Sequence, residues 1–340
     1  MKITECLSGQ KHEIPPLWIM RQAGRYLPEY RAVRQTTSDF ISFCLDSEKA
    51  AKVTLQPIKR FDVDAAIIFS DILMINWAMK RNVEFISGTG PVMTPLEDVK
   101  NLHIPDSSEC SELFAPVADA LKTVRQRLSD DKALIGFSGA PWTLMTYMVE
   151  GGSSRDFAES RKWLFDRPAK TEALIQILSD QVVEFLLIQS AAGADILMLF
   201  DSWAGSVPAS KREQIITKPH QAIISKLREK GIDKPIISFP KGLADGLPGY
   251  CDSVDIQAVA VDHMTDISWV HKNIRPDIAI QGNLDPQCLV AGGDQMRREI
   301  DMIRDCLKDR AHIFNLGHGI VPQTPPEHLA ELVNYVRRVR

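Results

Sequence analysis

The chain has 340 residues, of which 44% are hydrophobic and 25% are charged, a composition typical of globular proteins and not of disordered ones. Its formal net charge is −4 and its sequence pI is about 6.1, which argues against a protein whose whole surface binds nucleic acid or an anionic membrane. Any anionic ligand must therefore meet a local group of cations.

The cysteine pattern and the hydropathy lead to expectations about the compartment. The six cysteines are scattered and form no C-x-x-C pair, so we expect free thiols in a reducing compartment and no cysteine-based metal site. The first five residues begin no apolar signal core, and Glu184, Gln189 and Asp195 interrupt the most apolar run, 182–200. These patterns predict a cytoplasmic protein that binds neither membranes nor nucleic acid.

Short apolar runs alternate along the chain with longer segments of helical period, which indicates a parallel sheet with crossover helices. Eight runs predict strands, at residues 17–20, 65–69, 133–137, 196–200, 235–239, 258–261, 278–281 and 312–316. The runs are largely apolar, as expected of strands that are buried on both faces. Eight such units favour the α/β fold of a closed (β/α)8 TIM barrel over an open doubly wound sheet, and no G-x-G-x-x-G motif follows the first run.

Helices are predicted between these strands, at residues 47–60, 111–128, 169–192, 210–230, 294–308 and 326–338, with shorter helices after the sixth strand. Two stretches exceed a minimal repeat. Residues 81–95 resemble a hairpin excursion after the second strand, and residues 141–166 resemble a helical insertion after the third. No linker rich in Gly, Ser or Pro is present, so we expect residues 1–340 to form a single domain.

In a barrel of this kind the side chains that follow the strands converge on one mouth, where chemistry is placed. The residues that follow the eight predicted strands are, in order, Arg21 and Arg25, Asp71, Gly139 and Tyr147, Ser202, Lys241, Asp262 and His263, Asn283 and Asp285, and His318. Any one of them can equally be an ordinary residue of a loop that faces solvent. Together they predict a polar site at the mouth.

Arg21 and Arg25 give the sharpest signal in this set. Two guanidinium groups four residues apart suit bidentate binding of separate carboxylates, and Gly24 between them allows a ligand to approach the backbone closely. The alternative is a pair of surface salt bridges.

Asp71 and His318 also have two readings each. Asp71 lies within the apolar run 69–74, so it is either a member of a structural ion pair or a functional acid that faces a ligand. His318 lies between Gly317 and Gly319, which either admit a ligand or only turn the chain into the last helix. Histidine side chains can titrate near neutrality, which leaves a role for His318 in proton transfer open.

Several common catalytic motifs are absent from the sequence. It contains no G-x-x-x-x-G-K-[ST], no H-E-x-x-H, no G-x-S-x-G and no paired-cysteine zinc spacing. NTPase, metalloprotease and hydrolase functions therefore lack their usual motifs here.

Two long segments resemble the signatures of one enzyme family. Residues 16–25, PLWIMRQAGR, resemble the N-terminal signature of uroporphyrinogen decarboxylases, and residues 136–151, GFSGAPWTLMTYMVEG, resemble their second signature. Shorter family-like stretches are FSDIL at 69–73, FDSWAG at 200–205, QGNLDP at 281–286 and NLGHG at 315–319. The resemblance runs from about residue 18 to the C-terminus.

The resemblance implies a homodimeric barrel that converts the acetate side chains of uroporphyrinogen III to methyl groups, giving coproporphyrinogen III in haem biosynthesis, without a cofactor or a metal. By motif match, the substrate-binding positions are Arg21, Gln22, Ala23, Gly24, Arg25, Asp71, Tyr147, Ser202 and His318. Asp71 and Arg21 are expected to be catalytic, because an ionised carboxylate stabilises a pyrrole that becomes positive and a guanidinium holds carboxylates.

Two other functions compete with this one. Zinc- and thiol-dependent methyltransferases share the barrel, but they need a late His-x-Cys ligand pair, whereas His318 is followed by Gly319 and Ile320. The second competing function is a tetrapyrrole carrier that performs no catalysis. Nothing in the sequence suggests that a catalytic residue is missing, which speaks against such a carrier.

Overall fold

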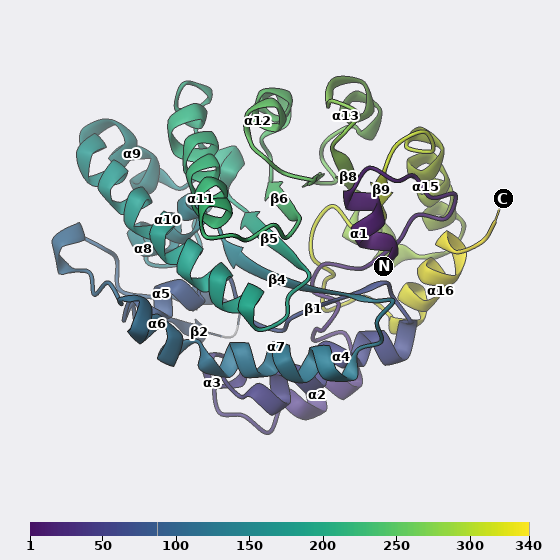
Figure 1. Ribbon diagram of the computed structural model, residues 1–340, viewed down its shortest axis with the longest axis horizontal. Helices are drawn as coiled ribbons and strands as arrows, with labels where there is room; N and C mark the ends of the chain where they lie inside the picture. Colours follow the sequence, from purple (N-terminus) through teal and green to yellow (C-terminus); the bar gives the residue numbers. More distant parts are fainter. Residues whose placement is uncertain (87, 340) are drawn as a thin grey trace.

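The computed structural model describes residues 1–86 and 88–339, and its centre is a seven-stranded sheet in the order β1-β4-β5-β6-β7-β8-β9 (Figure 1). All neighbouring strands of this sheet are parallel. The strands are β1 (Ala65–Ile67), β4 (Ala133–Gly139), β5 (Ile196–Asp201), β6 (Ile236–Pro240), β7 (Ala258–Ala260), β8 (Ala279–Gln281) and β9 (His312–Ile313). Seven of the eight predicted runs thus contain strands, and nearly all of their residues are buried, as strands covered by helices should be.

The first predicted strand, 17–20, is wrong. Only Leu17 forms a bridge in this segment, parallel to Phe314. Phe314 N–H donates to the Pro16 carbonyl at 2.8 Å on one side, and Asp64 N–H donates to the Leu17 carbonyl at 2.8 Å on the other. Residues 16–20, here called the closing segment, therefore complete the ring between β9 and β1. Proline has no backbone N–H, so Pro16 limits the ladder that this segment can build.

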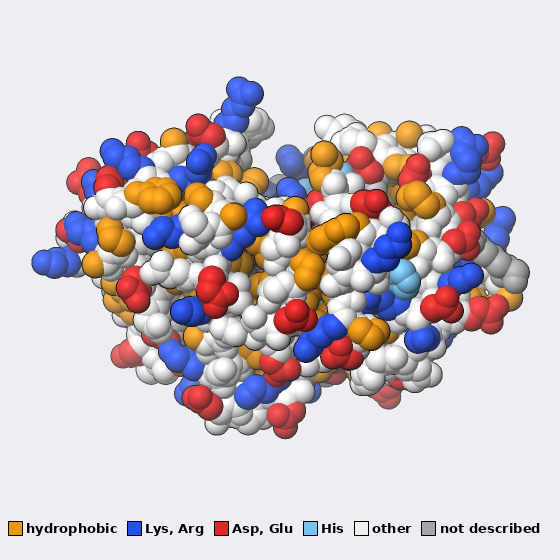
Figure 2. Space-filling view, turned by 90° about the horizontal axis from the view of Figure 1, so that it is seen from above, with side chains coloured by type: hydrophobic (Ala, Val, Ile, Leu, Met, Phe, Trp, Pro, Cys, Tyr) orange, Lys and Arg blue, Asp and Glu red, His pale blue; other side chains and the backbone are white. Residues whose placement is uncertain are grey.

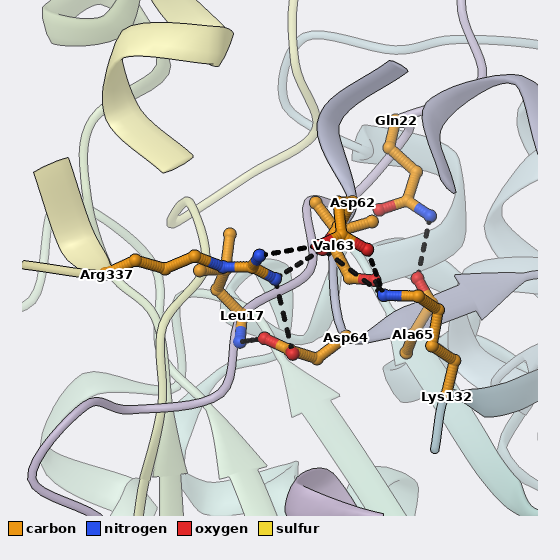
Figure 3. A network of polar contacts seen from close by, with 8 residues as sticks. All are labelled: Leu17, Gln22, Asp62, Val63, Asp64, Ala65, Lys132 and Arg337. Carbon is orange, nitrogen blue, oxygen red and sulfur yellow. Dashed lines mark hydrogen bonds and ion pairs between the residues drawn. The ribbon is translucent and has the colours of Figure 1, made fainter. Parts of the chain in front are cut away.

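A polar network fixes the start of the closing segment (Figure 3). Leu17 N–H donates to Asp64 Oδ2 at 2.8 Å, and Arg337 Nη1 pairs with Asp62 Oδ2 at 2.9 Å. Lys132 Nζ also contacts Asp62, at 2.6 Å from Oδ1. This network ties the segment to the residues before β1 and to the C-terminal part of the chain, and so fixes where the next residue, Arg21, emerges.

Four of the predicted helices are confirmed to within two residues at either end. They are α4 (Ser47–Phe61), α10 (Pro168–Ala191), α15 (Gly293–Cys306) and α16 (Pro326–Val336). The ribbon shows the helices arranged around the sheet (Figure 1). Within the described ranges, no helix combines the length and the apolar character needed to cross a membrane.

Two predicted helices are interrupted. The stretch 111–128 is two helices, α6 (Ser107–Leu113) and α7 (Ala115–Arg127), with Pro116 in the first turn of α7. The stretch 210–230 begins with a 3₁₀ turn (Ala209–Lys211) and a π-helical turn (Glu213–Thr217), and only then becomes α11 (Lys218–Glu229), with Pro219 in its first turn. Each proline lacks the N–H that would continue the preceding helix, so a new helix begins there.

Both predicted excursions are present. A hairpin of β2 (Glu84–Ile86) and β3 (Gly90–Val92) lies within 81–95, where Ser87 lies outside the described residues. The stretch 141–166 contains α8 (Pro141–Glu150) and α9 (Ala158–Asp166). The remaining helices are α1 (Lys2–Leu7), α2 (Pro28–Arg34), α3 (Phe40–Cys44), α5 (Met74–Ala78), α12 (Leu247–Ser253), α13 (Ile267–Asn273) and α14 (Pro286–Ala291), with 3₁₀ turns at Val99–Asn101, Ala204–Ser206 and Ala244–Gly246.

Candidate active site

The predicted site residues lie around the end of the barrel at which the parallel strands finish. Arg21 follows the closing segment, Asp71 follows β1, Tyr147 lies on α8 after β4, Ser202 follows β5 and His318 follows β9. Viewed from above, the molecule is hollowed at its upper edge, with basic and histidine side chains visible in the hollow (Figure 2). The strand order thus gathers on one rim residues that are almost 300 positions apart in the sequence.

Arg21 lies in a tight turn of unusual backbone conformation. Its φ is 62°, in the left-handed region that residues other than glycine rarely adopt. Gln22 N–H donates to the Ile19 carbonyl at 2.9 Å and closes the turn. A Cβ atom on Gly24 would lie 2.9 Å from the Arg21 carbonyl oxygen, so the turn requires glycine at this position.

Gln22 supports this turn with its side chain. It is buried, its Nε2 donates to the Ala65 carbonyl at 2.9 Å (Figure 3), and its Oε1 accepts from Ile19 N–H at 3.0 Å. Its own carbonyl accepts a hydrogen bond from the Tyr26 hydroxyl at 2.8 Å. The Gln22 amide therefore ties the Arg21 turn to β1, a role that the sequence did not reveal.

The Arg21 side chain lies against the loop that carries His318. A Cβ atom on Gly319 would overlap Cγ and Cδ of Arg21, so this glycine makes room for the arginine. The charge of Arg21 lowers the pKa of Asp71 and of Tyr147 and also that of His318, although burial is the larger influence on each of the three groups. Arg21 is thus a cation shared by the groups of the mouth.

Asp71 is a half-buried carboxyl with few partners. Its Oδ1 accepts from Leu73 N–H at 2.9 Å. Burial raises the pKa of Asp71 above the ordinary 3.8, while the Leu73 N–H and the Arg21 guanidinium oppose this rise. A carboxyl in such a place gains stability as an anion when a ligand supplies N–H donors, and a raised pKa in a cleft is typical of functional acids.

A hydrogen-bond network that the sequence did not reveal joins α8, which carries Tyr147, to the residues on either side of Ser202. The Thr143 hydroxyl, one turn before Tyr147 on α8, donates to Asp201 Oδ1 at 2.6 Å and accepts from Trp203 N–H at 3.2 Å. This network fixes the residues on both sides of Ser202, and the Tyr147 ring lies 6.3 Å from the Trp203 ring, centroid to centroid. The sequence offered one signal for this network, the polar residue Thr143 within the apolar part of the second signature.

His318 is half-buried and does not titrate near neutrality. Burial, and then the charges of Lys241, Arg21 and His263, lower the pKa of His318 to about 3. At this pKa the imidazole of the unliganded protein is neutral at pH 7 and can donate one hydrogen bond, so the pKa does not favour the proton-transfer role that the sequence left open.

Arg21 and Arg25 are both exposed. The carbonyl oxygen of Arg25 accepts from Arg31 Nη1 at 2.7 Å. Ala23 and Gly24 are half-buried between the two arginines. The two arginines differ in the groups on which their charges act, since Arg21 acts on Asp71 and His318 whereas Arg25 acts on Tyr30.

Across residues 1–86 and 88–339, no group of three or more His, Cys, Asp or Glu side chains is placed to hold a metal ion. The described cysteines are all free thiols, and most of them are buried.

Solved structures share the fold. A methyltransferase from Methanosarcina mazei superposes with a TM-score of 0.79 at 17% identity, covering 98% of this chain and 97% of that one. A B12-independent methionine synthase from Shewanella superposes with a TM-score of 0.57 at 10% identity, covering 94% and 95%. At such low identities these likenesses concern the barrel alone.

Sequence relatives define the family. The family model described as uroporphyrinogen decarboxylase (URO-D) matches residues 2–339. A uroporphyrinogen decarboxylase of Granulibacter bethesdensis is 43% identical over 340 residues, covering 99% of both chains, and one of Caulobacter vibrioides is 44% identical over 335 residues, covering 98% of this chain and 95% of that one. This chain therefore belongs to the uroporphyrinogen decarboxylase family.

Proposed function

We propose that this chain is a carboxy-lyase that removes the acetate carboxylates of uroporphyrinogen III as CO₂ and leaves methyl groups, giving coproporphyrinogen III for haem biosynthesis. Family membership over the whole chain supports the reaction. The observation that carries the assignment of the site is the half-buried Asp71 carboxyl beside the Arg21 cation at the barrel mouth.

The substrate can supply its own electron sink. Loss of CO₂ leaves an electron pair that most decarboxylases pass to a bound cofactor. Here a proton adds first to the pyrrole carbon next to the one that bears the acetate, and the ring becomes cationic. The C–CO₂ bond then breaks, its electrons neutralise the ring, and an exocyclic methylene forms. The methylene takes up one proton and the ring carbon loses one, so each cycle consumes one proton and releases one CO₂.

Asp71 has the properties needed to stabilise the cationic ring. Its ionised form faces the pyrrole N–H groups in this proposal, and its attraction to them grows as the nitrogens become positive. The same N–H groups would replace the hydrogen bonds that the half-buried carboxylate lacks. Stabilisation that is stronger in the transition state than in the ground state is what accelerates the reaction.

Arg21 is assigned two tasks. It binds the carboxylates of the substrate, and its charge favours the ionised form of Asp71, against the rise in pKa that burial causes. Arg25, which is exposed, binds a second carboxylate of the substrate. Gln22, Ala23 and Gly24 contribute through the turn that places both arginines.

Tyr147, Ser202 and His318 bind acetates or propionates as neutral groups. Burial raises the pKa of the Tyr147 hydroxyl, so it stays protonated and can donate. His318 donates as a neutral imidazole, and this favours binding over proton transfer. Ser202 lies on the rim between the two residues fixed by Thr143.

The remaining features of the proposal concern the whole protein. The reaction needs no cofactor or metal because the protonated pyrrole accepts the electrons. We further propose that the chain is one domain, acts as a homodimer in the cytoplasm and binds neither nucleic acid nor membranes, in keeping with its net charge of −4.

The test is an anaerobic incubation of the chelator-treated protein with uroporphyrinogen III, followed by oxidation and chromatography of the porphyrins. Coproporphyrin that appears through partly decarboxylated intermediates supports the reaction and its independence from metals. Uroporphyrin that is unchanged by folded protein rejects the proposal. Zinc bound in stoichiometric amount, with activity lost on its removal, would favour a methyltransferase-like site instead.

A further inference from the structure

Lys241 approaches the mouth from the side opposite to Arg21. In ring order the closing segment is followed by β1, β4, β5, β6, β7, β8 and β9, so β6 is the fourth strand from the closing segment in either direction. Lys241 directly follows β6, whereas Arg21 directly follows the closing segment. Their side chains still affect each other across the mouth, because the charge of Arg21 adds to the larger effect of burial in lowering the pKa of Lys241.

The backbone of Lys241 is held firmly. Its N–H donates to the Asp201 carbonyl at 3.1 Å, and its own carbonyl accepts from Gly205 N–H at 2.9 Å. Its ammonium group lies 5.6 Å from the centroid of the Trp203 ring. This cation–π contact places the half-buried Lys241 over Trp203, the ring of which also lies close to the ring of Tyr147.

The acid that acts most on Lys241 does not pair with it. Among the described residues, no carboxylate forms an ion pair with Lys241 within 4.0 Å. The carboxylate of Asp262 is occupied by the backbone, since Oδ2 accepts from Gly242 N–H and Oδ1 accepts from Met264 N–H, both at 2.9 Å. The charge of Lys241 is therefore left for an anion from outside the protein.

His263 lies against the loop that carries His318, the histidine whose pKa the charge of Lys241 also lowers, after the larger effect of burial. It follows β7, in a turn that Asn283 fixes by donating from Nδ2 to the Asp262 carbonyl at 3.0 Å. A Cβ atom on Gly317 would overlap the backbone of His263, so the loop of His318 packs directly against it. Within the described chain, Nδ1 of His263 and Nδ1 of His318 are both buried without a hydrogen-bond partner. Such groups favour a ligand that completes their hydrogen bonds.

We propose that Lys241, together with His263 and His318, forms a second carboxylate-binding subsite, which holds one edge of the tetrapyrrole while Arg21 and Arg25 hold the opposite edge. This inference rests on the proposed function. Every pyrrole ring of the substrate bears an acetate and a propionate, so a macrocycle centred on Asp71 presents carboxylates to both sides of the mouth. Lys241 acts on binding and orientation rather than on the reacting atoms.

The experiment compares the steady-state decarboxylation of uroporphyrinogen III by the wild type and by the variants Lys241→Met, Lys241→Arg and Lys211→Met. Methionine keeps an apolar chain over Trp203 but removes the charge, and arginine keeps the charge. Lys211 is a matched control, because its ammonium also lies over an aromatic ring, 5.7 Å from the Phe165 centroid, but on the outside of the barrel next to α11.

We expect Lys241→Met to raise KM about tenfold and to change kcat less than about threefold, since one charge-assisted contact is lost in both the ground and the transition state. Lys241→Arg should restore KM to within about threefold of the wild type, and Lys211→Met should leave it unchanged. The KM of the wild type should also rise more steeply with salt than that of Lys241→Met. An unchanged KM in Lys241→Met, or no rescue by arginine, overturns the inference while leaving wild-type activity intact. A wild type that releases no CO₂ would instead reject the proposed function itself.

Discussion

Gly319 is the residue on which the position of the Arg21 side chain depends. We predict that Gly319→Ala lowers kcat/KM about 10²-fold, because the new methyl group overlaps Arg21 and moves its guanidinium away from the substrate. Steady-state kinetics and a thermal unfolding curve check this together. Gly249→Ala is the matched control, since no atom lies within 4 Å of a Cβ atom at that glycine. Equal kinetics for the two variants would show that Arg21 need not lie where the structure has it.

The protonation state of His318 gives a second prediction at this scale. Its folded-state pKa is lowered from 6.5 to about 3, so its contribution to stability is present above pH 6.5 and is lost as the pH falls toward 3. In the unliganded protein, NMR signals of the His318 ring should therefore not move between about pH 8 and about pH 5. His318→Asn identifies these signals by their disappearance. A titration with a midpoint near 6.5 would contradict the neutral imidazole.

The sequence indicated which residues lie at the mouth better than it indicated their surroundings. Arg21, Asp71 and His318 were chosen as candidate site residues because each follows a buried run and lies in a family-like motif. The support given by Gln22 and Thr143 could not be found, since hydrogen bonds to Ala65 and Asp201 depend on segments that meet only in the folded barrel. The pKa of His318 likewise depends on burial and on cations that come from other strands.

At the scale of elements, the closing segment shows where pattern reasoning fails. Its apolar residues are buried like those of a strand, but Pro16 and the left-handed turn at Arg21 leave only one bridging residue, Leu17. Apolar periodicity reports burial, and hydrogen-bonded pairing is a separate property. Two helices that were predicted as continuous are interrupted near Pro116 and Pro219, whereas α4 continues through Pro57. Proline alone therefore does not decide where a helix breaks.

The anchoring of the closing segment can be measured. Asp64→Ala removes the acceptor of the buried Leu17 N–H, so we predict a loss of roughly 1–3 kcal/mol in the free energy of unfolding. Arg337→Met, which breaks partly exposed ion pairs to Asp62 and Asp64, should cost at most about 1 kcal/mol. Denaturant unfolding of both variants checks the difference. An Asp64→Ala protein as stable as the wild type would mean that the segment is held by other contacts.

At the scale of the whole molecule, the negative net charge does not reveal that the proposed site is rich in cations. The chain carries −4 overall, yet its barrel gathers Arg21, Arg25 and Lys241 around one mouth, where Asp71 is the carboxyl assigned to the reaction. A closed ring is what makes this possible, because cations from opposite strands then face a common centre. The alternation of apolar runs and helical segments predicted the fold class, and the residues after each run predicted which side chains lie at the mouth. The number of strands that pair by hydrogen bonds could not be predicted in this way.

The most direct test of the account is the effect of Asp71→Asn on turnover and on binding. Under anaerobic single-turnover conditions we predict that CO₂ release from uroporphyrinogen III falls at least about 10³-fold, because the amide cannot stabilise the cationic pyrrole. The Kd for uroporphyrinogen should stay within about fivefold of the wild type, since Arg21 and Arg25 still bind the carboxylates. Asp119→Asn, which changes an exposed acid on α7, controls for the substitution itself. Turnover of Asp71→Asn within about tenfold of the wild type would contradict the account and remove Asp71 from the reaction.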